Sequence, residues 1–192
     1  MDVIEAIRTR RTVANFRPDP VPAGDLTRLL ALGVWAPNHH LTEPWRFVVA
    51  GPQTQQRLAE RFAAWRMAKV APDAADAATR RARIGEESAR KFMSNPTVVA
   101  VAVALDGDEQ RRREDYAATC CAIQNVQLAA WAEGVGVKWS TSGVIRDPLA
   151  YELLGLDPAR YELIALLYVG YPAEFPTRER KLPLELVIRW TA

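Results

Sequence analysis

The chain has 192 residues, enough for one well-buried core, so a single domain is the simplest expectation. Hydrophobic residues make up 49% and charged residues 25%, which is typical of a soluble globular protein and excludes a disordered chain. The net charge of +2 is too small to indicate a nucleic-acid binder. The two cysteines, Cys120 and Cys121, are adjacent and cannot form a disulfide framework, which favours a reducing, cytoplasmic location.

The first 100 residues alternate helix signals with proline-rich breaks. The expected elements are a helix over Asp2–Arg10 with Asp2 as N-cap, a loop at Pro18, Pro20 and Pro22, a helix over Asp25–Val34 ended by Pro37, and a strand over Arg46–Ala50. Residues Thr54–Arg90 are predicted to be mostly helical, with a break at Pro72 and Asp73. Basic and acidic residues are interleaved there, which favours a solvated helix face over a nucleic-acid contact.

The second half carries the stronger core signals. The expected elements are a buried strand over Val98–Leu105, a long helix over Asp115–Glu133, a strand over Val137–Ser140, a short helix over Pro148–Leu154 closed by Gly155, and a strand over Leu163–Gly170. The longest strand-like apolar run is far shorter than the ~20 residues a spanning helix needs, so no membrane partner is expected. The Asp115–Glu133 helix is apolar on nearly every side, which predicts burial in the core or at a subunit contact.

Helices and strands mix without strict alternation, which indicates an α+β fold around a sheet of four or five strands. We expect one domain over residues 1–192, with a helical insert at about 54–92 and a C-terminal extension at about 171–192. The extension ends in Leu184-Glu185-Leu186-Val187-Ile188-Arg189-Trp190, an apolar segment that needs a surface to cover it, such as another subunit.

Four short motifs occur in a fixed order. They are Arg8-Thr9-Arg10-Arg11-Thr12, Ala36-Pro37-Asn38-His39-His40-Leu41-Thr42-Glu43-Pro44-Trp45-Arg46-Phe47, Gly134-Val135-Gly136-Val137-Lys138-Trp139-Ser140, and Gly170-Tyr171-Pro172. The guanidinium groups of the first motif suit phosphate oxygens, and a threonine hydroxyl can add a hydrogen bond. The alternative is a basic cluster that stabilises a helix C-terminus. The third motif is not a dinucleotide fingerprint, because it lacks a third glycine and follows a helix.

In this order and spacing, the motifs resemble the nitroreductase family of FMN-dependent oxidoreductases, above all its compact NAD(P)H-dependent branch. The resemblance covers roughly residues 2 to 190. It implies a nitroreductase-like fold with a mixed, mostly antiparallel sheet flanked by helices, in an intertwined homodimer with FMN at the subunit interface. It also implies cofactor contacts from Arg10, Arg11, Thr12, Trp35, His39, Trp139, Ser140, Thr141, Arg178 and Arg180.

The mechanism implied by the resemblance is ping-pong transfer of hydride from NADH or NADPH to a small-molecule acceptor: a nitroaromatic, a quinone or an activated alkene. The flavin N5 is then the reactive centre and the protein supplies no catalytic residue of its own. Helices of the 54–92 insert are expected to cover the flavin. Two other functions stay open: a flavin-binding or ligand-sequestering module with little or no turnover, and a basic nucleic-acid binder.

Several residues have plainer interpretations or depart from the family pattern. His39 and the adjacent His40 are also compatible with a metal site, a general base or two solvated loop residues, but no partner has metal-ligand spacing. Arg178 and Arg180 are equally compatible with a solvated tail. Many family members have a basic residue where this chain has Ala14, and the wider family has Asn and Gln where this chain has Leu41 and Glu43.

Overall fold

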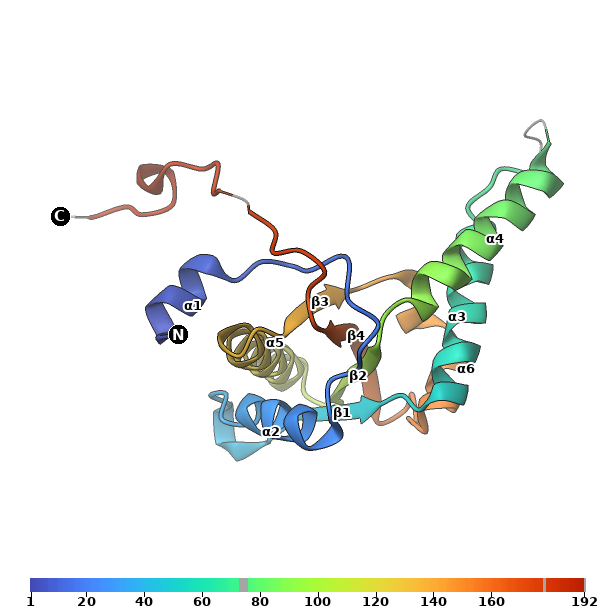
Figure 1. The fold of residues 1–192 in the computed structure, drawn as a ribbon. Coiled ribbons are helices and arrows are strands. Elements are labelled where there is room, and N and C mark those ends of the chain that lie inside the picture. The colour runs from blue at the N-terminus through green and yellow to red at the C-terminus, as the bar shows by residue number, and fades with distance from the viewer. Residues whose placement is uncertain (73–75, 178, 192) are drawn as a thin grey trace.

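The computed structural model describes residues 1–72, 76–177 and 179–191. The helices are α1 (Val3–Thr9), α2 (Ala23–Gly33), α3 (Pro52–Met67), α4 (Ala77–Met93), α5 (Glu109–Ala132) and α6 (Pro148–Leu154), with short 3-10 turns at η1 (His39–Leu41), η2 (Gly143–Arg146) and η3 (Leu184–Leu186). The strands are β1 (Trp45–Val49), β2 (Thr97–Ala104), β3 (Gly136–Ser140) and β4 (Tyr161–Gly170). Helices and strands thus form the expected α+β arrangement (Figure 1).

The described strands form one four-stranded sheet in the order β1-β2-β4-β3. All three pairings are antiparallel, and a register irregularity in β2 lies between Val101 and Ala102. The expectation of a mostly antiparallel sheet is therefore confirmed, although the described strands contain no parallel pairing that would make the sheet mixed. Strands β2 and β4 lie in the middle, which is why their sequences are continuous apolar runs and not alternating ones.

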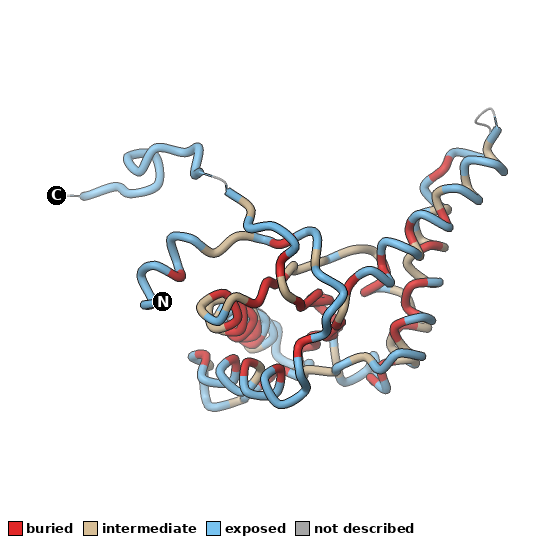
Figure 2. Tube along the Cα trace, viewed as in Figure 1, coloured by how far each residue is buried: buried red, intermediate tan, exposed pale blue. Residues whose placement is uncertain are grey.

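The sheet separates two halves of the core. On one face, Leu29 of α2 and Ile123 of α5 pack against Val99 and Val101 of β2. On the other face, Leu58 of α3, Phe92 of α4 and Leu154 of α6 pack against side chains that include Ala100, Ala102 and Leu166. The buried segments accordingly gather around the sheet in Figure 2, while both ends of the chain are largely exposed.

Most expected elements are present to within two residues because their ends have local causes. The Asp2 carboxylate accepts a hydrogen bond from the Glu5 amide at 2.8 Å and caps α1. Gly155 takes a left-handed conformation, with φ of 64°, and ends α6. A larger error concerns α5, which begins at Glu109, six residues before the predicted start at Asp115. The cause is the Asp108 side chain, which accepts from the Arg111 amide and starts two solvated polar turns.

The α5 helix is buried along one side only. Ala122, Ile123 and Val126 are buried toward the sheet and α2, whereas Tyr116, Ala117, Cys121 and Gln124 are exposed. The prediction of burial is therefore correct for the inner face. The exposed stripe, which still includes Ala117 and Cys121, is not covered by any described residue of the chain.

Two segments project from this core (Figure 1). Helices α3 and α4 pack side by side and extend beyond the sheet as a hairpin. The tail that follows residue 173 runs past α1 and away from the body of the protein. Among the described residues, no helix combines the length and apolar character that crossing a membrane requires.

Candidate cofactor site

The loop after α1 and the segment after β4 lie side by side. The Arg17 amide donates to the Tyr171 carbonyl at 2.8 Å, and the Ala173 amide donates to the Asn15 carbonyl at 3.1 Å. A β-bridge between Phe16 and Pro172 completes the pairing. Residues more than 150 positions apart are thereby fixed as neighbours, and this pairing brings the first motif next to the C-terminal tail.

The first cavity at this junction has a volume of about 450 Å³ and is strongly basic. Its walls are formed by Arg10, Arg11, Thr12, Ala14, Pro176, Glu179 and Arg180. Burial and the nearby guanidinium groups of Arg180 and Arg11 lower the pKa of Arg10. Three guanidinium groups face one carboxylate here, so the cavity is short of negative charge. A phosphate monoester would supply about −1.5 to −2 charge and suits guanidinium hydrogen bonding.

The structure thus brings together four of the residues predicted to bind the cofactor: Arg10, Arg11, Thr12 and Arg180. The Arg11 side chain also donates to the carbonyls of Arg8 and Arg10, at 2.8 and 2.9 Å, which closes the end of α1. The role predicted for Arg178 falls outside the described residues.

A second cavity of about 440 Å³ adjoins the first, because Ala14 belongs to the walls of both. Its other lining residues come from the loop after α1, the α3–α4 hairpin and the two strands β3 and β4: Asn15, Phe62, Glu87, Arg90, Lys91, Phe92, Ser94, Asn95, Lys138, Ser140 and Tyr168. Both volumes fall in the range of about 300–1,000 Å³ that is usual for ligand sites.

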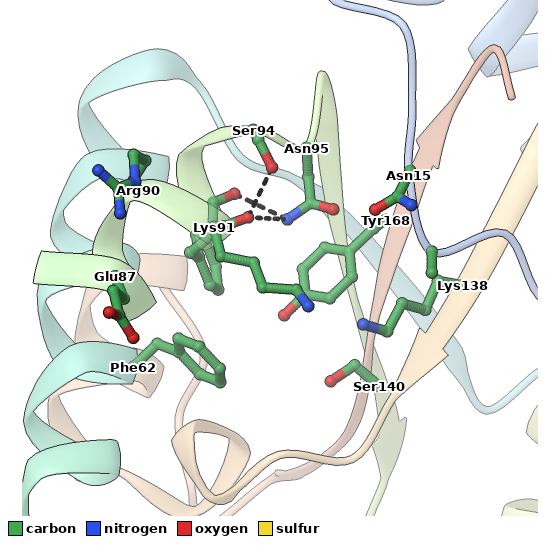
Figure 3. A pocket seen from close by; sticks show the side chains of 12 residues that line it. Asn15, Phe62, Glu87, Arg90, Lys91, Ser94, Asn95, Lys138, Ser140 and Tyr168 are labelled. Carbon is green, nitrogen blue, oxygen red and sulfur yellow. Dashed lines mark hydrogen bonds between the residues drawn. The ribbon is translucent and has the colours of Figure 1, made fainter. Parts of the chain in front are cut away.

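Lysine side chains enter the second cavity from two sides (Figure 3). Lys91 extends from α4 and Lys138 from β3, and they point toward one another beside the Tyr168 ring. The Lys138 Nζ lies 5.6 Å from the centroid of that ring. Burial and the nearby Lys91 lower the pKa of Lys138. Burial also raises the pKa of the Tyr168 phenol, an effect that the hydroxyl groups of Ser140 and Ser142 oppose.

The wall on the α4 side is held by hydrogen bonds at the end of the helix. The Asn95 side-chain amide donates to the carbonyl of Phe92 at 2.7 Å and to that of Lys91 at 3.2 Å, and the Ser94 hydroxyl donates to the Lys91 carbonyl at 2.9 Å. The Gln55 amide of α3 in turn donates to the Asn95 carbonyl at 2.7 Å. These bonds satisfy carbonyls that the helix end would leave unpaired and fix the position of Lys91.

The third motif contributes one side chain to the cavity. Ser140 lies in its wall, while Trp139 faces the opposite side of the strand and packs on the core. The Trp139 indole nitrogen is buried with no hydrogen-bond partner in the described structure. Thr141 is exposed just beyond the end of β3. The backbone contacts predicted for this segment stay a prediction.

The second motif lies elsewhere in the chain. His39 Nδ1 is 2.8 Å from the Glu114 carboxylate, and the two histidine rings stack with centroids 3.9 Å apart. His39 lines a shallow surface cavity beside Cys121, and Trp35 is 82% exposed. Neither residue belongs to the walls of the two joined cavities. Within one chain, the structure therefore does not bring them to the basic site.

The loop that carries His39 is conformationally unusual. His40, Leu41 and Glu43 all have positive φ, between 44° and 56°, which costs free energy for residues other than glycine. The loop is held by the Thr42 hydroxyl, which donates to the buried Asp115 carboxylate at 2.5 Å, and by the Glu43 amide, which donates to the Asn38 side chain at 3.0 Å. The two departures from the family pattern, Leu41 and Glu43, thus coincide with a constrained backbone.

Comparison with known proteins agrees with this geometry. The sequence profile described as the Nitroreductase family matches residues 7–171. The chain belongs to the nitroreductase family.

Its relatives cover nearly the full length. YfhC of Bacillus subtilis, which carries the name of an NAD(P)H nitroreductase, is 33% identical over 186 residues, with 94% of this chain and 89% of YfhC covered. A crystal structure of a nitroreductase-like family protein from Bacillus cereus has a TM-score of 0.82 at 29% identity and covers 100% of this chain and 96% of that one. The nitroreductase-like fold predicted from the motifs is therefore confirmed.

A more distant neighbour from Desulfovibrio desulfuricans was solved in complex with FMN. Its TM-score is 0.74 at 23% identity, and the comparison covers 100% of this chain and 98% of that chain. At that identity the likeness concerns the fold.

Sequence reasoning missed Lys91, Lys138, Asn95 and Tyr168 as residues of the site. A signal for Lys138 was present: on a strand, side chains two positions apart share a face, so Lys138 had to lie on the same side as the predicted residue Ser140. For Lys91 and Tyr168 no local signal existed, because helix α4 and strand β4 meet only in the folded chain.

Proposed function

We propose that this protein is an FMN-dependent oxidoreductase that transfers hydride from NADH or NADPH to a nitroaromatic, quinone or activated-alkene acceptor by a ping-pong mechanism. The observation that carries the proposal is the pair of neighbouring cavities that share Ala14, of which one is basic and the other is lined by aromatic, amide and ammonium groups. Membership of the nitroreductase family and the FMN complex of a protein with the same fold support it.

The donor groups present fit FMN. Arg10, Arg11 and Arg180, with the Thr12 hydroxyl, would hold the phosphate, because they place excess positive charge in one cavity. Burial first, and the nearby guanidinium groups of Arg180 and Arg11 second, lower the pKa of Arg10, and a bound phosphate would oppose both effects because it favours the charged form. The second cavity would hold the ring, with hydrogen-bond donors from Asn15 and Ser140.

When bound, FMN would supply hydride transfer at N5; the chain's own residues would orient the reactants and control access of water. Phe62 and Phe92 form apolar parts of the wall, which limits water at that side of the cavity. Lys91 and Lys138 supply positive charge within reach of the same space. The nicotinamide and the acceptor would occupy one place in turn, which a single open cavity permits.

A homodimer is part of the proposal. The tail exposes Leu184, Leu186 and Trp190, the last at 92%, and α5 exposes the stripe that contains Ala117 and Cys121. A second copy that covers these surfaces would bury apolar area that one chain leaves in water. It would also be the route by which Trp35 and His39 reach a cofactor held by the partner subunit. We place the protein in the cytoplasm, in keeping with its two free cysteines.

The first experiment is the visible absorption spectrum of the purified protein before and after anaerobic addition of NADH or NADPH. We expect a flavin spectrum that bleaches with at least one nucleotide, and the faster nucleotide identifies the coenzyme. Bound flavin that does not bleach would indicate a flavin-binding module and not an enzyme. A protein that neither carries nor takes up FMN would contradict the proposal altogether.

The phosphate assignment has its own test. Arg10→Ala should bind FMN at least about tenfold more weakly, because a charge-assisted hydrogen bond contributes roughly 1.5–3 kcal/mol. Arg112→Ala is the matched control, since Arg112 is exposed on α5 and does not line either cavity. Equal FMN dissociation constants for Arg10→Ala and the wild type, measured by fluorescence titration, would exclude Arg10 as a phosphate ligand.

A further inference from the structure

The two cavities share an uncharged loop residue, and the second of them is also lined by a strand lysine, Lys138. Ala14 ends at a methyl group and brings no charge to the wall that it shares. Strand β3 passes the same cavity, and its alternation turns Lys138 and Ser140 into it while Val137 and Trp139 pack on the core. Strand β3 therefore supplies a cation to the second cavity.

Lys138 is held in an environment that leaves its charge uncompensated. In the described parts of the chain, no carboxylate lies within 4 Å of the ammonium group of Lys138 or Lys91. Lys91 faces Lys138 across the cavity and contributes a like charge (Figure 3). Glu87 is the one acidic residue among the lining side chains, against three basic ones.

A packing role for Lys138 on the Tyr168 ring does not explain why its ammonium group faces that of Lys91. A lysine stem can cover an aromatic face while its ammonium reaches water, and the Tyr168 ring offers such a face. That role would favour an ammonium directed away from other cations. Here both ammonium groups point into one cavity, where each raises the free energy of the other unless an anion is present.

Reduction of a flavin by hydride produces such an anion. One hydride adds two electrons and one proton to the neutral ring system, so the product carries one negative charge more than the oxidised form. Positive groups that are already in place stabilise the charge as it appears, without reorganisation. Groups at the same distance have little effect on the neutral oxidised ring.

We propose that Lys138 is the residue that tunes the cofactor in this protein: with Lys91, it stabilises reduced FMN over oxidised FMN. The inference rests on the proposed function, because it requires FMN in the second cavity. It assigns to a strand lysine a role in setting the reduction potential that neither its sequence motif nor the family match assigns.

The test compares the reduction potential of bound FMN in four proteins: wild type, Lys138→Met, Lys138→Arg and the double variant Lys138→Met/Ala14→Lys. Dithionite titration against a reference dye gives the potential without NAD(P)H or an acceptor. Lys138→Met should weaken the preference for reduced over oxidised FMN roughly tenfold, which corresponds to a potential about 30 mV more negative for a two-electron couple. Lys138→Arg should keep the wild-type potential, and Ala14→Lys should restore much of the loss.

Lys69→Met serves as the control for removing a lysine, because Lys69 lies over Trp65 near the far end of α3 and outside both cavities. Far-ultraviolet circular dichroism establishes whether each variant is folded. If Lys138→Met does not fold, the comparison of Lys138→Arg with the wild type still tests the inference. An unchanged potential in Lys138→Met would overturn the inference, as would equal weakening of both redox forms. A wild-type protein that binds no FMN would instead defeat the proposed function and the inference with it.

Discussion

Strand β4 and the C-terminal tail are both rich in large apolar residues, yet one is buried and the other is exposed. Residues 163–170 of β4 are all buried, between α5 on one face and the α3–α4 and α6 helices on the other. In the tail, Leu182, Leu184, Leu186, Val187, Ile188 and Trp190 are all exposed. The chain therefore supplies its own cover for β4, whereas the described part of the chain leaves these tail side chains in water, which is the reason for proposing a second copy as their cover.

The largest expected effect on stability concerns the buried strand β4. Leu166→Ala, at a fully buried position of β4, should lower the free energy of unfolding by about 2–5 kcal/mol, because it removes apolar contact and leaves a cavity. The measurement is urea denaturation at fixed protein concentration. Leu186→Ala is the matched control, since Leu186 is 70% exposed. Equal losses in a fully monomeric sample would show that the tail is packed against its own chain.

A second prediction concerns self-association through the exposed C-terminal tail. Leu186→Ser together with Trp190→Ser should weaken self-association at least about tenfold, because apolar anchors at an interface commonly contribute more than 1 kcal/mol each. Sedimentation velocity over a concentration series measures the effect. Val49→Ser on the edge strand β1 is a control for the loss of an exposed apolar residue. An unaltered dimer, or a wild-type monomer, would contradict the assignment of the tail to a subunit interface.

The smallest expected effect on stability concerns the contact between His39 and Glu114, which lies outside both apolar regions. Hydrogen bonding to His39 first, and to Gln110 second, lowers the pKa of Glu114 from its ordinary value of 4.5. A carboxyl whose folded pKa is lowered stabilises the fold above that ordinary value, and the contribution is lost as the pH falls through the lowered pKa. Because the pair is exposed, solvent screens it and the loss is small.

Glu114→Gln should consequently flatten the decline in stability slightly below pH 4.5, with little change at neutral pH. Thermal unfolding across the acid range tests this, with Glu60→Gln as an exposed control on α3. A pronounced loss of stability at neutral pH would mean that the His39 loop depends on Glu114 far more than an exposed ion pair allows.

Elements with local causes were predictable. The prolines, the Asp2 cap and Gly155 fix where helices begin and end, whatever the rest of the chain does. The start of α5 was predicted wrongly because the apolar pattern begins at Asp115, while the helix begins at its polar cap, Asp108. A pattern of burial cannot indicate helical turns that face water on every side.

The residues of the candidate site likewise include some that the sequence predicted and some that only the fold revealed. Arg10, Arg11 and Thr12 were recognisable from adjacent residues. Arg180 was predicted only from the family resemblance, and the structure brings it beside them through the pairing of residues 15–17 with residues 171–173. Trp35 and His39 were predicted beside the cofactor but lie away from the cavities within one chain, so that prediction now depends on a second copy. Lys91 and Tyr168 could not be assigned to the site before the fold was known.

The sequence alone determined the α+β class and the family, because these depend on composition, residue order and neighbouring side chains. It also predicted a phosphate-binding role for the first motif. The tertiary structure decided which distant residues share a cavity, and hence that Lys138 faces Lys91 in the second cavity. The physical reason is that electrostatic interaction depends on distance in space and on burial. Both are set when β3, β4 and the α3–α4 hairpin pack together, and the spacing of residues along the chain predicts neither.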